Sequence, residues 1–488
     1  MALVDGKGAA GTGPGPVALS VTRRRPGRPY PFPAMPGLLA PASERVRSLP
    51  SRHGRWTLAI LALIVVVGFG LRAHRALNPI DHPGADAHAY FSLSKALYTD
   101  GTYGGPSFHD ASDWSPGAPL LYAGVYYLTG GVRDGAARIV VALLGAAAIV
   151  IVYLLGRRLA GPAAGLLAAA GVALYPSFIY SNGALLSEPP AIFTLPAAVL
   201  AFLWARERSS PWAWLLPGGL FGLTALIRPE YLLVGFAIAI ATLVGIGRDR
   251  GWRLGAGAAG LLVAGLLVPI VPWTIHNIVS LDRFVPISTG AGKALYVGTD
   301  LSADGDYQRV KAELVQRYEG RTLEPGSAQL NAINPTPLFS RVAARYPDLP
   351  RDSALGKIGK QNFSKYFGED PLGYAAMTVR KVWRMWSAGI GDAMESGAGR
   401  VIQVLLVLLG FAGFALLGLR HRWWEFAVFA LPIGLVTAVG AVSLASTRRN
   451  EVLMSLVIPL AATTLVWGWD QARQRLADRG AVADATGA

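Results

Sequence analysis

Runs of about twenty predominantly apolar residues recur along almost the whole length of this chain. Each run is long enough to cross the hydrocarbon core of a bilayer as a helix. The chain of 488 residues is 52% hydrophobic and only 15% charged, which is typical of a polytopic membrane protein. The sequence therefore predicts an all-α membrane protein with about ten transmembrane helices, at 56–76, 137–156, 162–180, 189–205, 212–228, 231–247, 254–273, 400–420, 424–445 and 452–469.

Arginine clusters lie at alternate ends of successive apolar runs, at 157–158, 206–208, 248–253, 420–422 and 473–479. The positive-inside rule places such clusters in the cytoplasm, so we expect a multi-pass plasma-membrane protein with both termini inside. The formal charge of +15 is explained by these clusters facing an anionic inner leaflet. We therefore expect the lipid bilayer as a partner and no nucleic acid.

This orientation divides the chain into five regions. Residues 1–55 are rich in Pro, Gly and Arg and predict a disordered basic cytoplasmic tail. Residues 56–273 are expected to form a transmembrane module whose first exported loop, 78–136, carries juxtamembrane helices. The three remaining regions are expected to be a larger exported loop between helices 7 and 8, the C-terminal transmembrane helices and a second cytoplasmic tail, at 274–399, 400–469 and 470–488.

The larger exported loop contains one amphipathic segment, "DPLGYAAMTVRKVWRMWSAG". A helical reading places apolar side chains on one face, namely Val379, Val382, Trp383 and Trp386. The basic side chains fall elsewhere, namely Arg380, Lys381 and Arg384. This pattern predicts a helix that lies along the membrane interface beneath the loop.

The sequence requires no cofactor. "STGAGKAL" around Lys293 superficially resembles a phosphate-binding loop, but Ile287 stands where that motif needs Gly and Ala294 where it needs Ser or Thr. His88 and His109 have no second ligand at metal spacing, so no metal-ligating residue is assigned, and dependence on a divalent metal is left open. The chain has no cysteine, which excludes a thiol nucleophile and a disulfide.

Five segments carry a resemblance to a known family. They are "GADAHAYFSLSKALYTDG" with the following "SPGAPLL", "YPSFIYSNGALLSEPPAIF", "LIRPEYLL", "PWTIHNIVSLDRFVPISTGAGKALYVGTD" and "STRRNEVLMSLVIPL". In this order and topology the chain resembles the GT-C superfamily of membrane glycosyltransferases. It is similar to the branch that includes protein O-mannosyltransferases, aminoarabinose transferases and RgtA/B/C/D-like enzymes. Such enzymes take a sugar from a polyprenyl-phosphate carrier.

The resemblance implies an inverting hexosyl or pentosyl transfer on the exoplasmic side, from a polyprenyl-phosphate sugar to a glycan, lipid or protein acceptor. It implies two catalytic carboxylates, Asp86 as general base and Glu188, and six substrate-binding residues, Tyr90, Arg228, Glu230, Lys293, Arg448 and Arg449. A carboxylate can take the proton of an acceptor hydroxyl. A guanidinium can hold two oxygens of a departing phosphate.

Several of these residues also have a purely structural interpretation. Asp86 suits a helix N-cap, and Glu188 suits the positive end of a helix. Arg228 could simply pair with Glu230. The family often has an aromatic residue after its late arginine, whereas Arg449 follows Arg448 here, so the choice between the two arginines stays open.

Two other classes of protein share these features. A transporter or lipid flippase would place charges within broken helices near the middle of the membrane, but the interiors of the apolar runs are nearly free of charge. A non-catalytic scaffold of a cell-envelope complex would have the same loops without needing Asp86. Replacement of that residue discriminates best between scaffold and enzyme.

Overall fold

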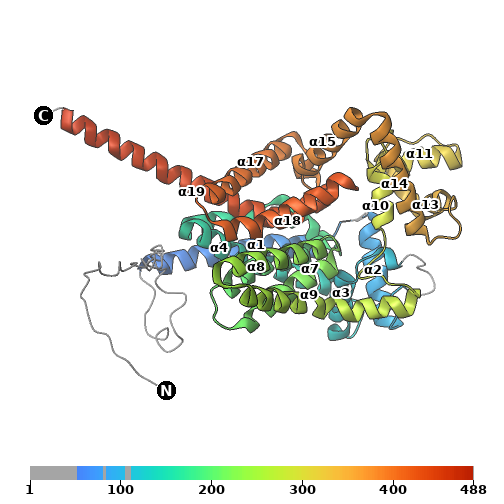
Figure 1. Cartoon of the computed structure of the whole chain (residues 1–488), viewed down its shortest axis with the longest axis horizontal. Helices are drawn as coiled ribbons and strands as arrows, with labels where there is room; N and C mark the ends of the chain where they lie inside the picture. Colours follow the sequence, from blue (N-terminus) through green and yellow to red (C-terminus); the bar gives the residue numbers. More distant parts are fainter. Residues whose placement is uncertain (1–51, 81–83, 105–110, 487–488) are drawn as a thin grey trace, which may run out of the picture. The chain divides into compact units, whose positions relative to one another are not determined.

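A computed structural model describes residues 52–80, 84–104 and 111–486, and the chain from Gly54 onwards forms one unit. All the regular elements of the described residues are helices (Figure 1). The predicted all-α membrane architecture is therefore confirmed. The predicted N-terminal tail and His109 lie outside the described residues, apart from the last few residues of the tail.

Within the described ranges, eight helices are long and apolar enough to span a membrane. They are α1 (Arg52–Leu77), α4 (Asp134–Leu174), α6 (Glu188–Ala205), α8 (Tyr231–Arg250), α9 (Trp252–Leu281), α17 (Gly397–Leu419), α18 (Trp423–Val442) and α19 (Thr447–Thr486). A shorter apolar stretch consists of η3 (Pro211–Trp214) and α7 (Leu215–Ile227).

Helix α4 explains why ten predicted segments correspond to eight long helices and one short one. Its backbone leaves the helical conformation at Ala160 and at Gly161, whose φ of 84° is open to glycine. A Cβ on Gly156 would lie 2.8 Å from the carbonyl oxygen of Ala164, and one on Gly165 would lie 2.7 Å from that of Tyr153. The chain therefore turns back on itself, and α4 is a hairpin of the two predicted spans.

The shorter helices lie in the two predicted exported loops and before α6. The first loop contains α2 (Gly84–Thr99), η1 (Ala111–Asp113) and α3 (Gly117–Thr129). The segment before α6 contains α5 (Pro176–Tyr180) and η2 (Ser181–Gly183). The larger loop contains α10 (Ala291–Gly298), α11 (Tyr307–Glu319), α12 (Ala328–Ala332), α13 (Pro335–Ala343), α14 (Arg351–Glu369), α15 (Pro371–Ser387) and α16 (Asp392–Glu395).

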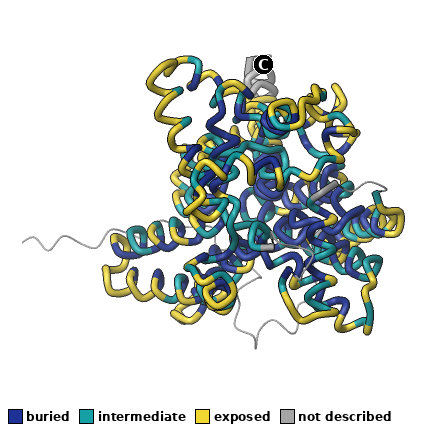
Figure 2. Tube along the Cα trace, turned by 90° about the vertical axis from the view of Figure 1, so that its right-hand side faces the viewer, coloured by how far each residue is buried: buried dark blue, intermediate teal, exposed yellow. Residues whose placement is uncertain are grey.

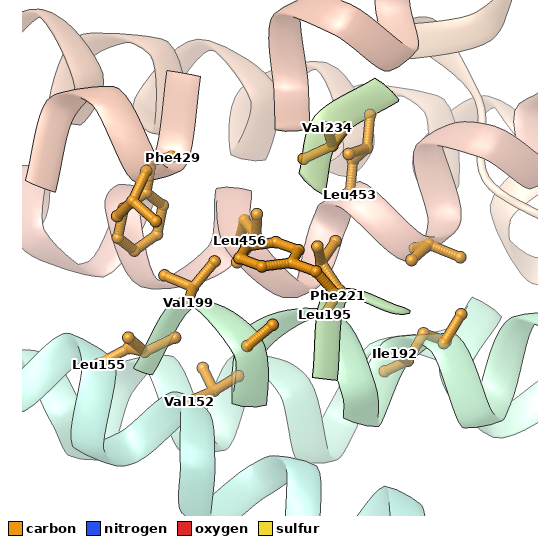
Figure 3. Packing of buried hydrophobic residues seen from close by; sticks show 14 of the residues in the cluster. Val152, Leu155, Ile192, Leu195, Val199, Phe221, Val234, Phe429, Leu453 and Leu456 are labelled. Atoms are coloured by element: carbon orange, nitrogen blue, oxygen red, sulfur yellow. The ribbon is translucent and has the colours of Figure 1, made fainter. Parts of the chain in front are cut away.

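The membrane core is built around α4, α6 and α19, which pack against one another. Figure 3 shows side chains of this core close together, including Val152, Leu195, Phe221, Val234, Phe429 and Leu456, and these six residues belong to α4, α6, α7, α8, α18 and α19. Buried residues gather inside the bundle, whereas several helices around it expose long stretches of surface (Figure 2). Helices α7 and α9 approach at backbone distance, since a Cβ on Gly218 would lie 2.1 Å from the oxygen of Leu262.

The arginine clusters of successive spans gather at one end of this bundle. Arg158 in the α4 turn pairs with Glu207 after α6. Arg422, before α18, donates a hydrogen bond of 2.7 Å to the carbonyl of Leu159. Arg206 lies over the ring of Trp424. The clusters that the sequence assigns to one side of the membrane are therefore neighbours in space.

Helices α10 to α14 form a subdomain with its own apolar core, which includes Val297, Val310, Leu314, Phe339 and Leu355. Its helices have conventional boundaries. Asp306 caps α11 by accepting hydrogen bonds from two backbone N–H groups, and Asn334 caps α13. The larger loop is thus a folded helical unit. It lies at the end of the bundle opposite the arginine clusters, because the N–H of Leu444, just after α18, donates a hydrogen bond to the carbonyl of Ala294 in α10.

The predicted amphipathic helix exists as α15, but its faces differ from those the pattern predicts. Val379 and Trp383 are exposed, whereas Trp386 is buried and packs against Phe411 of α17. Lys381, which the pattern places away from the apolar face, is completely buried. The helix packs across α17, α18 and α19. The face that carries Lys381, which the pattern predicts to be polar, is therefore covered by protein.

Candidate functional site

Six of the eight predicted site residues meet in one row of alternating charge, which we call the charge row. Its members come from the starts of α2, α6 and α19 and from the short connection between α7 and α8. Each neighbouring pair is an ion pair. In order, the row consists of Asp86, Arg448, Glu188, Arg228, Glu230 and Arg449.

Glu188 lies at the centre of the row because the sequence "SEPP" starts a helix there. The two prolines lack an N–H group and are favoured in the first turn of a helix, where no partner is needed. The carboxylate accepts hydrogen bonds from Nε and Nη2 of Arg448, the second at 2.9 Å. It also accepts a bond of 3.1 Å from Nη1 of Arg228. Glu188 is thus held between two guanidinium groups.

The sequence "RPE" builds the inner end of the row. Pro229 ends α7 at Ile227 and lets Glu230 precede the first residue of α8. Nε of Arg228 lies 3.2 Å from Oε1 of Glu230. That carboxylate lies 4.0 Å from Nε of Arg449, whose Nη1 donates to Ser443 at 3.3 Å. The pairing of Arg228 with Glu230 that the sequence left open is present, as part of the larger row.

Arg228 and Glu230 are both charged. Burial by itself would lower the pKa of the Arg228 guanidinium, but the carboxylates of Glu230 and Glu188 raise it above its ordinary value. Burial by itself would raise the pKa of Glu230, but Arg228 and Arg449 bring it below its ordinary value. Along the row, three carboxylates thus face three guanidinium groups.

The row opens to solvent at one end. The side chain of Asp86 is 40% exposed, whereas that of Glu188 is completely buried. Asp86 lies in the first turn of α2, two residues after its first residue, where the helix dipole also favours a carboxylate. Its carboxylate contacts Nη1 of Arg448. A molecule arriving from solvent therefore meets Asp86 and Arg448 first.

Tyr90 also belongs to this site. It follows Asp86 by one turn of α2 and is buried against Trp114, with ring centroids 5.4 Å apart. Burial and the nearby carboxylate of Glu188 raise the pKa of the phenol to about 12, although Ser187 and Arg228 act in the opposite direction. The Tyr90 hydroxyl is thus a neutral donor beside Glu188.

Lys293 lies in a different cluster. Its Nζ is 3.9 Å from Oδ2 of Asp113, which also pairs with Arg351 at 2.6 Å. The other oxygen of Asp113 accepts a bond of 2.6 Å from Thr289. These contacts tie η1 of the first loop to the starts of α10 and α14. They join Lys293 to the connection between the two loops, without a described contact to the charge row.

The sequence reasoning missed Glu451, which lies one helical turn after Arg448 on α19. Its side chain is completely buried, and neither carboxylate oxygen has a hydrogen-bond partner. The neighbouring Asn450 donates to the carbonyl oxygens of Met385 and Ala388. A carboxylate at the start of an apolar run is itself a signal for a functional residue, and "RRNEVLM" contains that signal.

No group of three or more His, Asp or Glu side chains in the described ranges is arranged to hold a metal ion. Within the charge row, each carboxylate already faces a guanidinium group and is therefore not available as a metal ligand. What the row can do chemically is accept a proton at Asp86 and bind an anion at Arg448.

Residues 113–276 of the chain match the family described as dolichyl-phosphate-mannose-protein mannosyltransferase. No curated protein sequence matches the chain. The archaeal oligosaccharyltransferase AglB from Archaeoglobus fulgidus, in complex with an inhibitory peptide and a dolichol-phosphate, has a similar structure. The TM-score is 0.52 and the identity 16%, over 88% of this chain and 52% of AglB. The apo form of that enzyme gives a TM-score of 0.53 at 16% identity, with the same coverage.

ArnT from Cupriavidus metallidurans, bound to undecaprenyl phosphate, matches 84% of this chain and 78% of its own length at 17% identity, with a TM-score of 0.37. The chain spans about half of the length of AglB, so the likeness concerns that part of the archaeal enzyme. The family match covers the segment from η1 to α9, which contributes three of the six charge-row residues. The resemblance seen in the sequence is thus confirmed, and the chain has the membrane fold of the GT-C glycosyltransferases.

Proposed function

We propose that this protein transfers a sugar from a polyprenyl-phosphate carrier to an acceptor hydroxyl at the exoplasmic surface of the plasma membrane. The observation that carries the proposal is the meeting of Asp86 and Arg448 at the open end of the charge row. A proton acceptor and a phosphate-binding group are the two groups that such a transfer needs. The dolichol-phosphate bound to AglB and the description of the matching family support a lipid-phosphate donor.

The two ends of the bundle support this side of the membrane. The end that gathers the arginine clusters of Arg158, Arg206 and Arg422 is the one that the positive-inside rule assigns to the cytoplasm. The charge row lies at the other ends of the same spans. A lipid-linked donor with its tail in the bilayer would present its phosphate and sugar at that level.

Arg448 is the arginine we assign to the phosphate. Glu188 occupies one edge of its guanidinium through Nε and Nη2, which fixes the plane of the group. Nη1 points toward Asp86 and the open end. Arg449, by contrast, is engaged at the inner end of the row by Glu230 and Ser443. The donor phosphate would therefore compete with Asp86 for Nη1 of Arg448.

This competition links donor binding to the base. As the phosphate takes Nη1, Asp86 is released to accept the proton of the acceptor hydroxyl. The acceptor oxygen then forms a bond to the anomeric carbon while the bond from that carbon to the phosphate oxygen breaks. The proton goes to Asp86, the bonding electrons leave with the polyprenyl phosphate, and Arg448 stabilises the charge that develops there. Attack opposite the leaving phosphate inverts the anomeric centre.

Glu188 has a supporting part in this mechanism. Its carboxylate is completely buried and engaged by two guanidinium groups, which leaves an acceptor hydroxyl no access to it. We assign it the positioning of Arg448 and Arg228. Tyr90 and Arg228 line the same site, and we assign them contacts to the sugar or to the carboxylates around it.

The decisive experiment is Asp86→Asn in the full-length protein. Asn starts a helix about as well as Asp, so a capping role predicts near-normal activity, and even a lost cap costs only about 1 kcal/mol of stability. Loss of a general base predicts a rate lower by roughly a hundredfold to ten-thousandfold. Transfer from a polyprenyl-phosphate sugar and thermal stability are measured on the same purified variant. Asp100→Asn, at the exposed end of α2, is the matched control.

Removing a base should lower the rate at least about a hundredfold. If Asp86→Asn keeps more than about a tenth of the wild-type rate, the loss is smaller than this, and Asp86 is not the catalytic base. A wild-type protein that binds the donor but transfers no sugar to any acceptor hydroxyl would favour the scaffold instead. Movement of intact donor across the bilayer without sugar transfer would favour a flippase.

A further inference from the structure

The buried lysine of α15 has an unusual place in the fold. Lys381 is 0% exposed, although Trp383 two residues later is 61% exposed. Burying an ammonium group is costly unless it finds hydrogen-bond acceptors. Its Nζ donates bonds of 2.7 Å to the carbonyl of Gly298 and 2.9 Å to that of Ala441. The side chain thus reaches two other elements from the inner face of α15.

Both acceptors lie at helix C-termini. Gly298 is the last residue of α10, and Ala441 is next to the last residue of α18. The final carbonyls of a helix have no partner within the helix and attract positive charge. Lys381 therefore joins the subdomain, α15 and the last span before Arg448 at a single point.

Close contacts around the same point leave little freedom. A Cβ on Gly298 would lie 2.1 Å from the carbonyl carbon of Ser443, and the N–H of Leu444 donates to Ala294 at 3.0 Å. Gly305, with a φ of 59°, lies against the Lys381 side chain, where a Cβ would come within 2.6 Å of Cδ. Only glycine combines this conformation with this approach.

The connection between α18 and α19, residues 443–446, leads directly from this junction to the charge row. The Ser443 hydroxyl accepts a hydrogen bond from Arg449. Arg448 is the residue immediately before Arg449 in the chain. A shift of this connection would move both guanidinium groups relative to Glu188 and Glu230, which are carried by other helices.

The charged groups that face the ammonium are Arg384 on α15, Arg449 on α19 and Asp304 after α10. Asp304 is engaged by Arg384 at 2.6 Å and by Arg380 at 2.8 Å. Burial, followed by Arg384 and Arg449, lowers the pKa of Lys381 to about 8. The amine of Lys381 needs only two N–H donors to bond to the carbonyls of Gly298 and Ala441. The contact therefore depends on the length and the hydrogen bonds of the side chain more than on its positive charge.

We propose that Lys381 is a positioning residue that sets the place of Arg448 and Arg449 by holding the connection between α18 and α19 against the subdomain. This inference rests on the proposed function for its effect on the donor, but the position of the connection can be measured without it. Through Lys381, the subdomain of α10 to α14 controls how well the membrane part binds the lipid phosphate.

The test is Lys381→Met, which keeps the chain length and removes the donors. Arg380→Met is the matched control, because it removes a neighbouring positive charge from the exposed side of the same helix. The protein has no cysteine, so cysteines introduced at the exposed Val442 and Arg321 take two spin labels without competing sites. The label-to-label distance and the transfer kinetics are measured for wild type and both variants.

Lys381→Met should broaden the distance distribution and raise KM for the donor by about ten- to a hundredfold, with a smaller change in kcat, because the guanidinium groups are misplaced but present. Arg380→Met should change neither. Should Lys381→Met fail to fold, Gly298→Ala disturbs the same junction through Ser443 and should have the same two effects. A distance distribution and a donor KM within twofold of wild type would overturn the inference. Failure of transfer in wild type would count against the proposed function, while the distance measurement would still decide the role of Lys381.

Discussion

The Glu188 carboxylate is the point at which the charge row can be broken most cleanly. Glu188→Gln keeps the size and the helix position but removes the negative charge between Arg448 and Arg228. Three hydrogen bonds from guanidinium nitrogens end on this carboxylate. Bonds to charged groups contribute about 1.5–3 kcal/mol each. Asp86 and Glu230 still compensate the charges of the two arginines, so the loss of unfolding free energy should be smaller than the sum of these three bonds. We expect it to be about 3–5 kcal/mol, the usual cost of removing one partner of a buried ion pair.

The assay is thermal unfolding of the purified full-length protein, with Glu207→Gln as the matched control. Glu207 also pairs with an arginine, but at the solvent-exposed opposite end, where a pair contributes about 0–1 kcal/mol. Combining Glu188→Gln with Arg228→Met should cost less than the sum of the single changes, since the two share one interaction. If Glu188→Gln lowers Tm no more than Glu207→Gln, the row is not the buried network described above.

Three further predictions concern the same architecture. Arg448→Lys should keep the fold but weaken transfer substantially, since an ammonium cannot replace the planar group that holds Glu188 through Nε and Nη2 while Nη1 reaches the phosphate; unchanged donor KM and kcat would assign the phosphate elsewhere. A reporter that is active only outside the cytoplasm should be active when inserted in the exposed loop after Gly320 and silent after Gly487, and the reverse pattern would invert the topology. Glu451→Gln should leave Tm unchanged or raise it, because neither carboxylate oxygen has a hydrogen bond to lose; a clear fall in Tm would reveal a partner.

Much of the membrane fold could be predicted because its signals are local. The arginines at 157 and 158 followed by "AGP" separate two apolar runs, and the structure turns the chain back at Gly161. "SEPP" and "RPE" mark helix boundaries through proline chemistry, and both boundaries appear where charge-row residues are held. Element boundaries and the identities of six row members were therefore accessible from short segments and from the family resemblance.

The remaining features depend on contacts between distant segments, which leave no local pattern. Lys293 resembles a ligand-binding lysine in its own segment, yet its partner Asp113 belongs to the first loop. Lys381 belongs by helical periodicity to the polar face of an interfacial helix, but α10 and α18 cover that face. The sequence could nominate Arg448 and Asp86 separately, while their pairing required the start of α19 to meet the start of α2 in space.

The distance along the chain between members of the charge row has a consequence for biosynthesis. The two legs of the α4 hairpin touch through Gly156 and Gly165, so they can pack as soon as α4 has been made. Glu188 and Arg448, by contrast, are 260 residues apart, and α19 is made after all the other described helices. Until then Glu188 and Arg228 form a bundle end without their outer arginine. A chain released before α19 could therefore insert most of its described spans and still lack the site, so the row is complete only once α19 has been made and inserted.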